Sequence, residues 1–236
     1  NHPPDPENKV GSYSHQIIQR LPVKLDIKKA VVKNTYIEYK EKSNITQKIG
    51  KVELWGSSAT ISNITNLKGK IAKNNLMVVD MQSRLLNKVP VYATWTFYLG
   101  NKDGKFHIKG RTGGGDVRLL NPLTIPMGPV ELTSGYINSL EFDLTGTNYN
   151  MSGTLKLLYD DLHVALLEKN HHSDEFNKRK VTSLLANIKI KNKNPEKDEA
   201  PRITQVNYQR NIHASIFNLA WKSLFTGVQE TIGAPH

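Results

Sequence analysis

The sequence contains no cysteine. This absence excludes a disulfide framework, a thiol nucleophile and thiolate metal sites. It does not decide the compartment, because proteins of the cell envelope can also fold without disulfides. Apolar runs are also short, and none approaches the roughly 18 residues that a membrane-spanning helix needs. The chain begins at Asn1 and not at Met, so we expect any anchor or signal segment to lie upstream.

Catalytic patterns are missing as well. The chain has no G-x-S-x-G elbow, no phosphate-binding G-x-x-x-x-G-K-[ST] and no H-E-x-x-H. Asp160 and Asp161 are adjacent in a predicted strand, so their side chains point to opposite faces. The glycines at 113–115 do not open a predicted helix and are better explained by a strand bend. His171-His172 lacks further ligands at a suitable spacing. We therefore predict no enzyme, no metal site and no cofactor.

Acidic residues are also comparatively few, so the chain is basic. The 236 residues carry 32 Lys and Arg against 21 Asp and Glu, a net charge of +11, and only residues 121–167 are net acidic. Most lysines alternate singly with apolar residues and do not cluster with aromatics, which disfavours nucleic acid as a partner. A diffuse positive field suits an anionic membrane surface or lipid headgroup. The competing interpretation is that these lysines line solvated strand faces.

Apolar residues alternate with polar ones along most of residues 21–167, which is the period of strands with one wet face. The run 91–99 is the clearest case, and the run 132–144 places Leu132, Tyr136 and Leu140 on one parity. The parity switches near Asp160-Asp161, which predicts a bulge. Six residues are expected on a shared inner face: Trp95, Phe97, Phe106, Leu140, Phe142 and Leu157.

Turn residues at 101–104 and 146–150 separate these runs at hairpin distances, so sequential strands should be antiparallel. Helices are predicted only near 174–190 and 214–232. The second has Ser215 as its N-cap and Gly233 as its C-cap, and a short strand at 203–208 lies between the two. We expect residues 1–20 to be irregular and residues 21–233 to form a single β-rich domain.

Two helices are few for so many half-apolar strands, because burying each large apolar side chain is worth roughly 1.5–3 kcal/mol. The sequence thus predicts a mainly β fold, a large curved antiparallel sheet with two C-terminal helices. The sheet either covers itself as a sandwich or barrel or leaves an open groove for acyl chains. The alternation of apolar and polar residues does not distinguish a self-covered sheet from an open groove.

An ordered set of short segments resembles the C-terminal region of AsmA-like bacterial envelope proteins of the Bacteroidota type. The resemblance covers about Leu21 to Gly233, and its main segments are Leu120-Asn121-Pro122-Leu123, Ser134-Gly135-Tyr136-Ile137, Tyr159-Asp160-Asp161-Leu162, Tyr208-Gln209-Arg210 and Phe217 to Val228. It implies a periplasmic or envelope protein, anchored by an upstream membrane helix, with a curved sheet whose apolar groove carries phospholipids between membranes. It implies no catalytic residues.

Two functions follow as expectations. The first is lipid binding or transfer between bacterial membranes, with acyl chains on the six inner-face residues and with a phospholipid headgroup or anionic membrane at a basic rim. The second is a structural or partner-docking module of an envelope assembly with a closed core. The rim candidates are Lys178, Arg179, Lys180 and Lys222. The candidate docking helix carries Phe217, Trp221, Leu224 and Phe225.

Overall fold

The computed structural model describes residues 7–43, 46–128, 130–169, 176–178 and 190–234. One antiparallel sheet dominates it. Its strands are β1 (Asp26–Lys42), β2 (Ile49–Thr65), β3 (Leu76–Leu85), β4 (Val89–Tyr98), β5 (Phe106–Thr112), β6 (Gly115–Asp116), β7 (Val130–Gly146), β8 (Asn150–Lys169), β9 (Phe176–Lys178) and β10 (Thr204–Gln209). The helices are α1 (Ser14–Gln19), α2 (Lys68–Ile71), the 3₁₀ helix η1 (Val117–Leu120), α3 (Asn121–Met127) and α4 (Ile216–Ile232).

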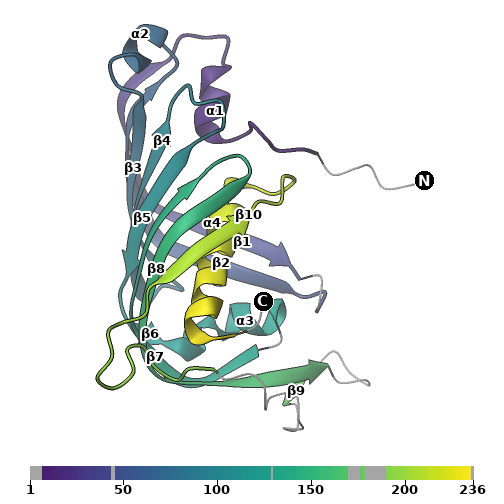
Figure 1. Ribbon diagram of the computed structural model, residues 1–236. Helices are drawn as coiled ribbons and strands as arrows, with labels where there is room; N and C mark the ends of the chain where they lie inside the picture. The colour runs from purple at the N-terminus through teal and green to yellow at the C-terminus, as the bar shows by residue number, and fades with distance from the viewer. Residues whose placement is uncertain (1–6, 44–45, 129, 170–175, 179–189, 235–236) are drawn as a thin grey trace, which may run out of the picture.

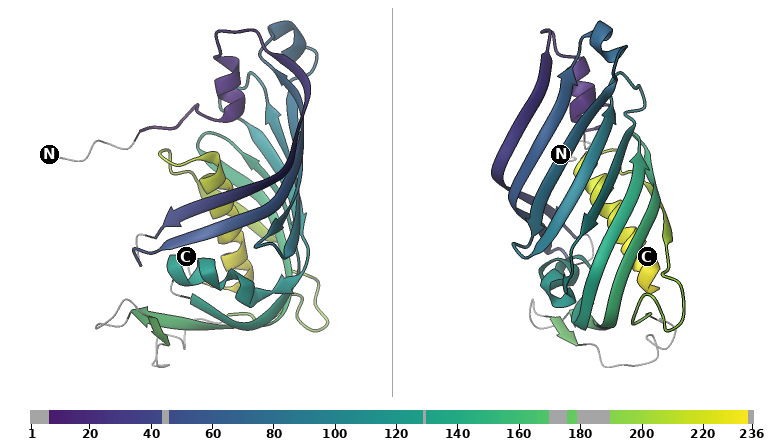
Figure 2. Two further views of the ribbon diagram at one scale, coloured as in Figure 1. Left: turned by 180° about the vertical axis from the view of Figure 1, so that it is seen from behind. Right: turned by 90° about the vertical axis from the view of Figure 1, so that its left-hand side faces the viewer.

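The strands follow one another in the order β1-β2-β3-β4-β5-β7-β8-β10, with β6 beside β7 and β9 beside β8. The sheet is strongly curved, and its concave side holds α4, with α1 near one end and α3 near the other (Figures 1 and 2). It does not close, since β1 and β10 lie at opposite ends of this order. The predicted mainly β fold is confirmed, in its open and curved form.

The predicted hairpins are confirmed by the strand register. Trp95 pairs with Ile108 across the loop at 101–104, and Gly146 pairs with Met151 across the second loop. The predicted bulge is also present, with Asp161 at φ 52° and a register shift opposite it. Gly135, at φ 132°, lies against the backbone of residues 160–162, a conformation and an approach that suit glycine.

This irregular stretch corrects one detail of the predicted inner row. Tyr136 was expected to share the parity of Leu132 and Leu140. In the structure Tyr136 is 51% exposed, and its neighbour Ile137 packs against the core in its place. The cause is the set of register shifts between Leu132 and Ser139, because each extra residue turns the following side chains to the other face.

The C-terminal helix forms as predicted. The Ser215 hydroxyl accepts a hydrogen bond from the backbone of Asn218, and Gly233 ends the helix in the left-handed conformation at φ 76°. The helix packs on the inner face of β8 and β10. At Gly227 a Cβ atom would lie 2.8 Å from Val206 Cγ2 and 2.9 Å from Leu155 Cδ1, so glycine permits this close approach.

Two segments differ from expectation. Residues 1–20 were expected to be irregular, yet Ser14–Gln19 form α1, and the Tyr13 ring meets Phe106 edge-on at 5.6 Å. A helix was expected near 174–190, but within this range Phe176–Lys178 form the strand β9, which pairs with Leu167–Lys169 of β8. The rest of that predicted helix lies outside the described residues. Short-range periodicity did not reveal either tertiary pairing.

The helix α3 was not predicted, because helices were expected only near 174–190 and 214–232. Pro122 occupies the first turn, where a missing N–H costs nothing. Met127 lies over Gly50 of β2, and the Ser43 hydroxyl donates to the Met127 carbonyl at 3.2 Å. These contacts hold the end of the β1–β2 hairpin against α3.

Candidate functional site

The inner face of the sheet divides into a buried part and a half-exposed part. The six residues predicted for this face have the expected parity, but Phe106, Phe142 and Leu157 are buried in the core under α4 and the N-terminal segment. Trp95, Phe97 and Leu140 lie half-buried at the margin of that core. Of these six lipid or groove candidates, Phe106, Phe142 and Leu157 therefore belong to the core, and ligand contact by the other three stays a prediction.

The N-terminal segment accounts for much of this burial. The His15 ring lies 5.0 Å from the Phe97 ring, and the Tyr13 hydroxyl donates to the Thr147 carbonyl at 2.9 Å. Trp95 stacks on both Phe97 and Phe106 with centroids 5.9 Å apart. Residues 13–15 thus seal one end of the concave side, which sequence periodicity had not indicated.

The apolar face continues beyond this core toward β1. Ala59, Ile61, Val79, Met81 and Ala93 lie on the same side as Trp95 by strand register, and all are only half-buried. These five residues and Trp95 form what we call the inner apolar surface. By strand register these residues share the face of Trp95, which packs against the core. This is the concave side of the sheet, where α3 and α4 also lie (Figure 2).

A flank of α4 adjoins this surface. Trp221 and Phe225 stack with centroids 6.0 Å apart and are half-buried, as is Leu224. Phe217, in the first turn, is 59% exposed, and its ring lies 6.2 Å from Trp95. Of the candidate docking residues, Phe217 therefore adjoins the inner apolar surface, and it is also the one most exposed to solvent.

Two polar contacts join α4 to the end of β1. The Asn218 amide donates to the Tyr39 hydroxyl at 2.8 Å, and the Lys222 ammonium lies 2.8 Å from a Glu41 carboxylate oxygen. These contacts and those at α3 hold the β1–β2 hairpin across the concave side. Lys222, predicted as part of a basic rim or as a membrane contact, is thus paired with a carboxylate, and its membrane role stays a prediction. The Lys178 side chain, Arg179 and Lys180 lie outside what the structure describes.

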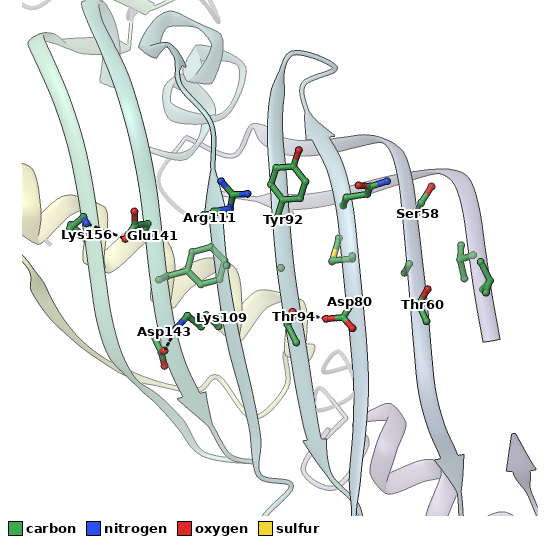
Figure 3. A pocket seen from close by; sticks show the side chains of 18 of the residues that line it. Ser58, Thr60, Asp80, Tyr92, Thr94, Lys109, Arg111, Glu141, Asp143 and Lys156 are labelled. Atoms are coloured by element: carbon green, nitrogen blue, oxygen red, sulfur yellow. Dashed lines mark hydrogen bonds and ion pairs between the residues drawn. The ribbon is translucent and has the colours of Figure 1, made fainter. Parts of the chain in front are cut away.

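The opposite, outer face carries a groove of about 1030 Å³ that crosses the sheet from β1 to β8 and is lined by both polar and apolar residues (Figure 3). We call it the outer groove. Strand register aligns its side chains in two rows. The first row is Ser58, Gln82, Tyr92, Arg111, Glu141 and Lys156. The second row is Thr60, Asp80, Thr94, Lys109, Asp143 and Thr154.

Neighbouring strands pair the charges of the outer groove. Lys156 Nζ lies 3.1 Å from Glu141 Oε2, and Lys109 Nζ lies 3.6 Å from Asp143 Oδ2. Asp143 Oδ1 also lies 2.6 Å from His107 Nε2, and this hydrogen bond holds the pKa of the Asp143 carboxyl below its usual range. The Thr94 hydroxyl donates to Asp80 at 2.7 Å. The polar alternation was visible in the sequence, but the rows depend on strand register.

The described residues contain no group of three His, Asp or Glu side chains arranged to hold a metal ion. Within the same part of the chain, no helix combines the length and apolar character needed to cross a bilayer. Asp160 accepts a hydrogen bond from Asn138 at 2.6 Å, whereas Asp161 lies 3.4 Å from His163. The adjacent aspartates therefore have separate partners.

The fold and these surfaces define an open, curved antiparallel sheet with an apolar inner side and an outer groove of mixed polar and apolar lining. No family model matches the chain, and no curated protein or solved structure matches it significantly.

Proposed function

We propose that this protein is a non-enzymatic lipid-binding protein of the bacterial envelope, which holds acyl chains on the inner apolar surface. The observation that carries the proposal is the exposure of this surface. Val79, Met81 and Ala93 share the inner face by strand register and remain half-exposed, although the β1–β2 hairpin, α3 and α4 lie around that side (Figure 2). Apolar side chains gain free energy when a ligand removes them from water.

Acyl chains suit this surface in chemistry and shape. It is aliphatic on β2 and β3 and has an aromatic ring at Trp95, and none of its six residues has an ionisable side chain. Each methylene taken out of water contributes about 0.8 kcal/mol, so one acyl chain supplies enough free energy to offset part of the cost of association. Transfer between membranes then requires no bond making and no cofactor.

The net charge of +11 supports a weak attraction to anionic membrane surfaces, where such a lipid would be loaded or released. The sequence resemblance to AsmA-like envelope proteins supports the same class of function and a periplasmic location. A docking module of an envelope assembly is the second candidate, and the 59% exposure of Phe217 favours it. In that case a partner protein covers Phe217 and the adjoining flank of α4.

A pair of adjacent substitutions tests the lipid proposal. Val79 and Val78 lie next to each other on β3, are both half-buried, and point to the inner and outer face respectively. Val79→Glu should weaken binding of a fluorescent phospholipid at least tenfold, because it puts a charge where the acyl chain lies. Val78→Glu should leave binding unchanged. Native mass spectrometry after gentle purification should show copurified lipid in the wild-type protein.

The two variants also control for folding, since each places a glutamate on the same strand. If both melt at similar temperatures and bind the phospholipid equally well, the inner apolar surface is not the site. If the wild-type protein carries no lipid and takes up no fluorescent phospholipid, the proposed function is wrong. Loss of envelope-protein binding on Phe217→Ala, with normal lipid uptake, would identify a docking role for α4 in its place.

A further inference from the structure

The outer groove is an extended channel and not a compact pocket. Seven strands contribute to it, from β1 through β5 and then β7 and β8. With about 4.8 Å between neighbouring strands, its length across the sheet is about 29 Å. Its floor consists of strand backbone, including that of a row of residues whose own positions face the inner side: Ala59, Met81, Ala93, Gly110 and Phe142. This shape fits an extended polymer better than one small molecule.

The groups along the groove combine hydrogen-bond donors and acceptors. Hydroxyls of Ser58, Thr60 and Thr94 alternate with amide, carboxylate and ammonium groups across the strands (Figure 3). Because these side chains stand on a sheet and several are already paired, little conformational freedom is lost when they contact a ligand. Sugar hydroxyls both donate and accept, as the hydroxyls of serine and threonine do, and they match such a mixed lining.

Charge balance narrows the class of ligand. The lining contains the cations Lys33, Lys109, Arg111 and Lys156 against the carboxylates Asp80, Glu141 and Asp143, and two of these lysines are paired with carboxylates. A polyphosphate or nucleic acid requires an excess of unpaired cations. The nearly neutral groove lacks that excess, although the chain as a whole carries +11.

An aromatic ring lies in the groove. Tyr92 is 42% exposed, and the Arg111 guanidinium carbon sits 4.8 Å from the centre of its ring. This contact holds the ring in place from one side. Aromatic faces are suitable partners for the apolar C–H faces of pyranose rings. From the length, the mixed hydrogen bonding, the charge balance and this ring, we propose that the outer groove binds an uncharged oligosaccharide chain.

The test titrates the folded protein with cellohexaose, maltohexaose and chitohexaose and follows amide chemical shifts by NMR. At least one hexasaccharide should shift resonances of β4, β5 and β7 that line the groove. Tyr92→Ala should weaken this binding at least tenfold. Thr94→Val removes a groove hydroxyl without changing the shape of the side chain much, and should weaken binding severalfold.

Tyr98→Ala is the matched control, because Tyr98 lies on the same strand and outer face, with Lys105 at 4.8 Å from its ring, but outside the groove. It should bind the hexasaccharide as the wild type does. Absence of shifts with all three hexasaccharides overturns the proposal, as does equal weakening by Tyr92→Ala and Tyr98→Ala. Binding of dextran sulfate alone overturns it in favour of an anionic polymer. Val79→Glu should not change oligosaccharide binding, so the outcome is independent of the lipid proposal.

Discussion

A chain that ends at residue 213 should lose most of its folding stability and aggregate. Removing α4 uncovers Leu155 and Val206, which Gly227 approaches closely, and deletes the fully buried Leu219. It also removes the hydrogen bond of 2.7 Å between Thr231 and Thr204. Each large apolar side chain contributes roughly 1.5–3 kcal/mol on burial, so the loss amounts to several kcal/mol. This approaches the whole stability of a typical domain, about 5–15 kcal/mol.

Urea unfolding followed by circular dichroism measures this loss. A chain that ends after Gly233 retains the complete helix and its C-cap and is the control, with an unchanged midpoint expected. If the chain ending at residue 213 melts like the wild type, α4 is not the cover of β8 and β10. If such a stable truncated protein also stops binding anionic liposomes, α4 serves chiefly as a membrane contact.

The protein should also lose about 3 kcal/mol of stability between pH 6.5 and 4 through one side chain, His15. This residue is 1% exposed and packed near the rings of Tyr13 and Phe97. Burial lowers its pKa from 6.5 to about 4, because the charged imidazolium is poorly solvated there. The unfolded chain therefore binds a proton at a higher pH than the folded protein does.

Because the unfolded chain binds this proton more readily, acid favours unfolding. Stability due to neutral His15 is fully present above pH 6.5 and is lost as the pH falls toward 4, with the magnitude set by the pKa difference. His15→Phe keeps an aromatic ring but cannot titrate, so its unfolding free energy should depend less on pH in this window. Urea titrations at pH 7.5, 5.5 and 4.5 compare the two proteins. Parallel pH profiles would contradict the assignment to His15.

The amino-acid sequence by itself determined the strands, their hairpins and α4. Strict alternation along 91–99 and turn residues at 101–104 specify two antiparallel strands, since both signals act over a few residues. The same holds for α4, whose apolar stripe lies between a serine N-cap and a glycine C-cap. These features are local, so they do not depend on which distant segments meet.

Only the tertiary structure decided which apolar residues are core and which remain open. Phe106 and Trp95 lie on the same face of neighbouring strands, and each belongs to a run of alternating apolar and polar residues. Phe106 is nevertheless covered by Tyr13, about ninety residues earlier in the chain, whereas Trp95 is only half-buried. Lys222 likewise became an ion-pair partner only because β1 reaches α4 at Glu41. The outer groove arises in the same way, because strand register aligns residues from seven strands. Burial, ion pairing and groove shape depend on long-range contacts, and the spacing of residues along the chain does not encode them.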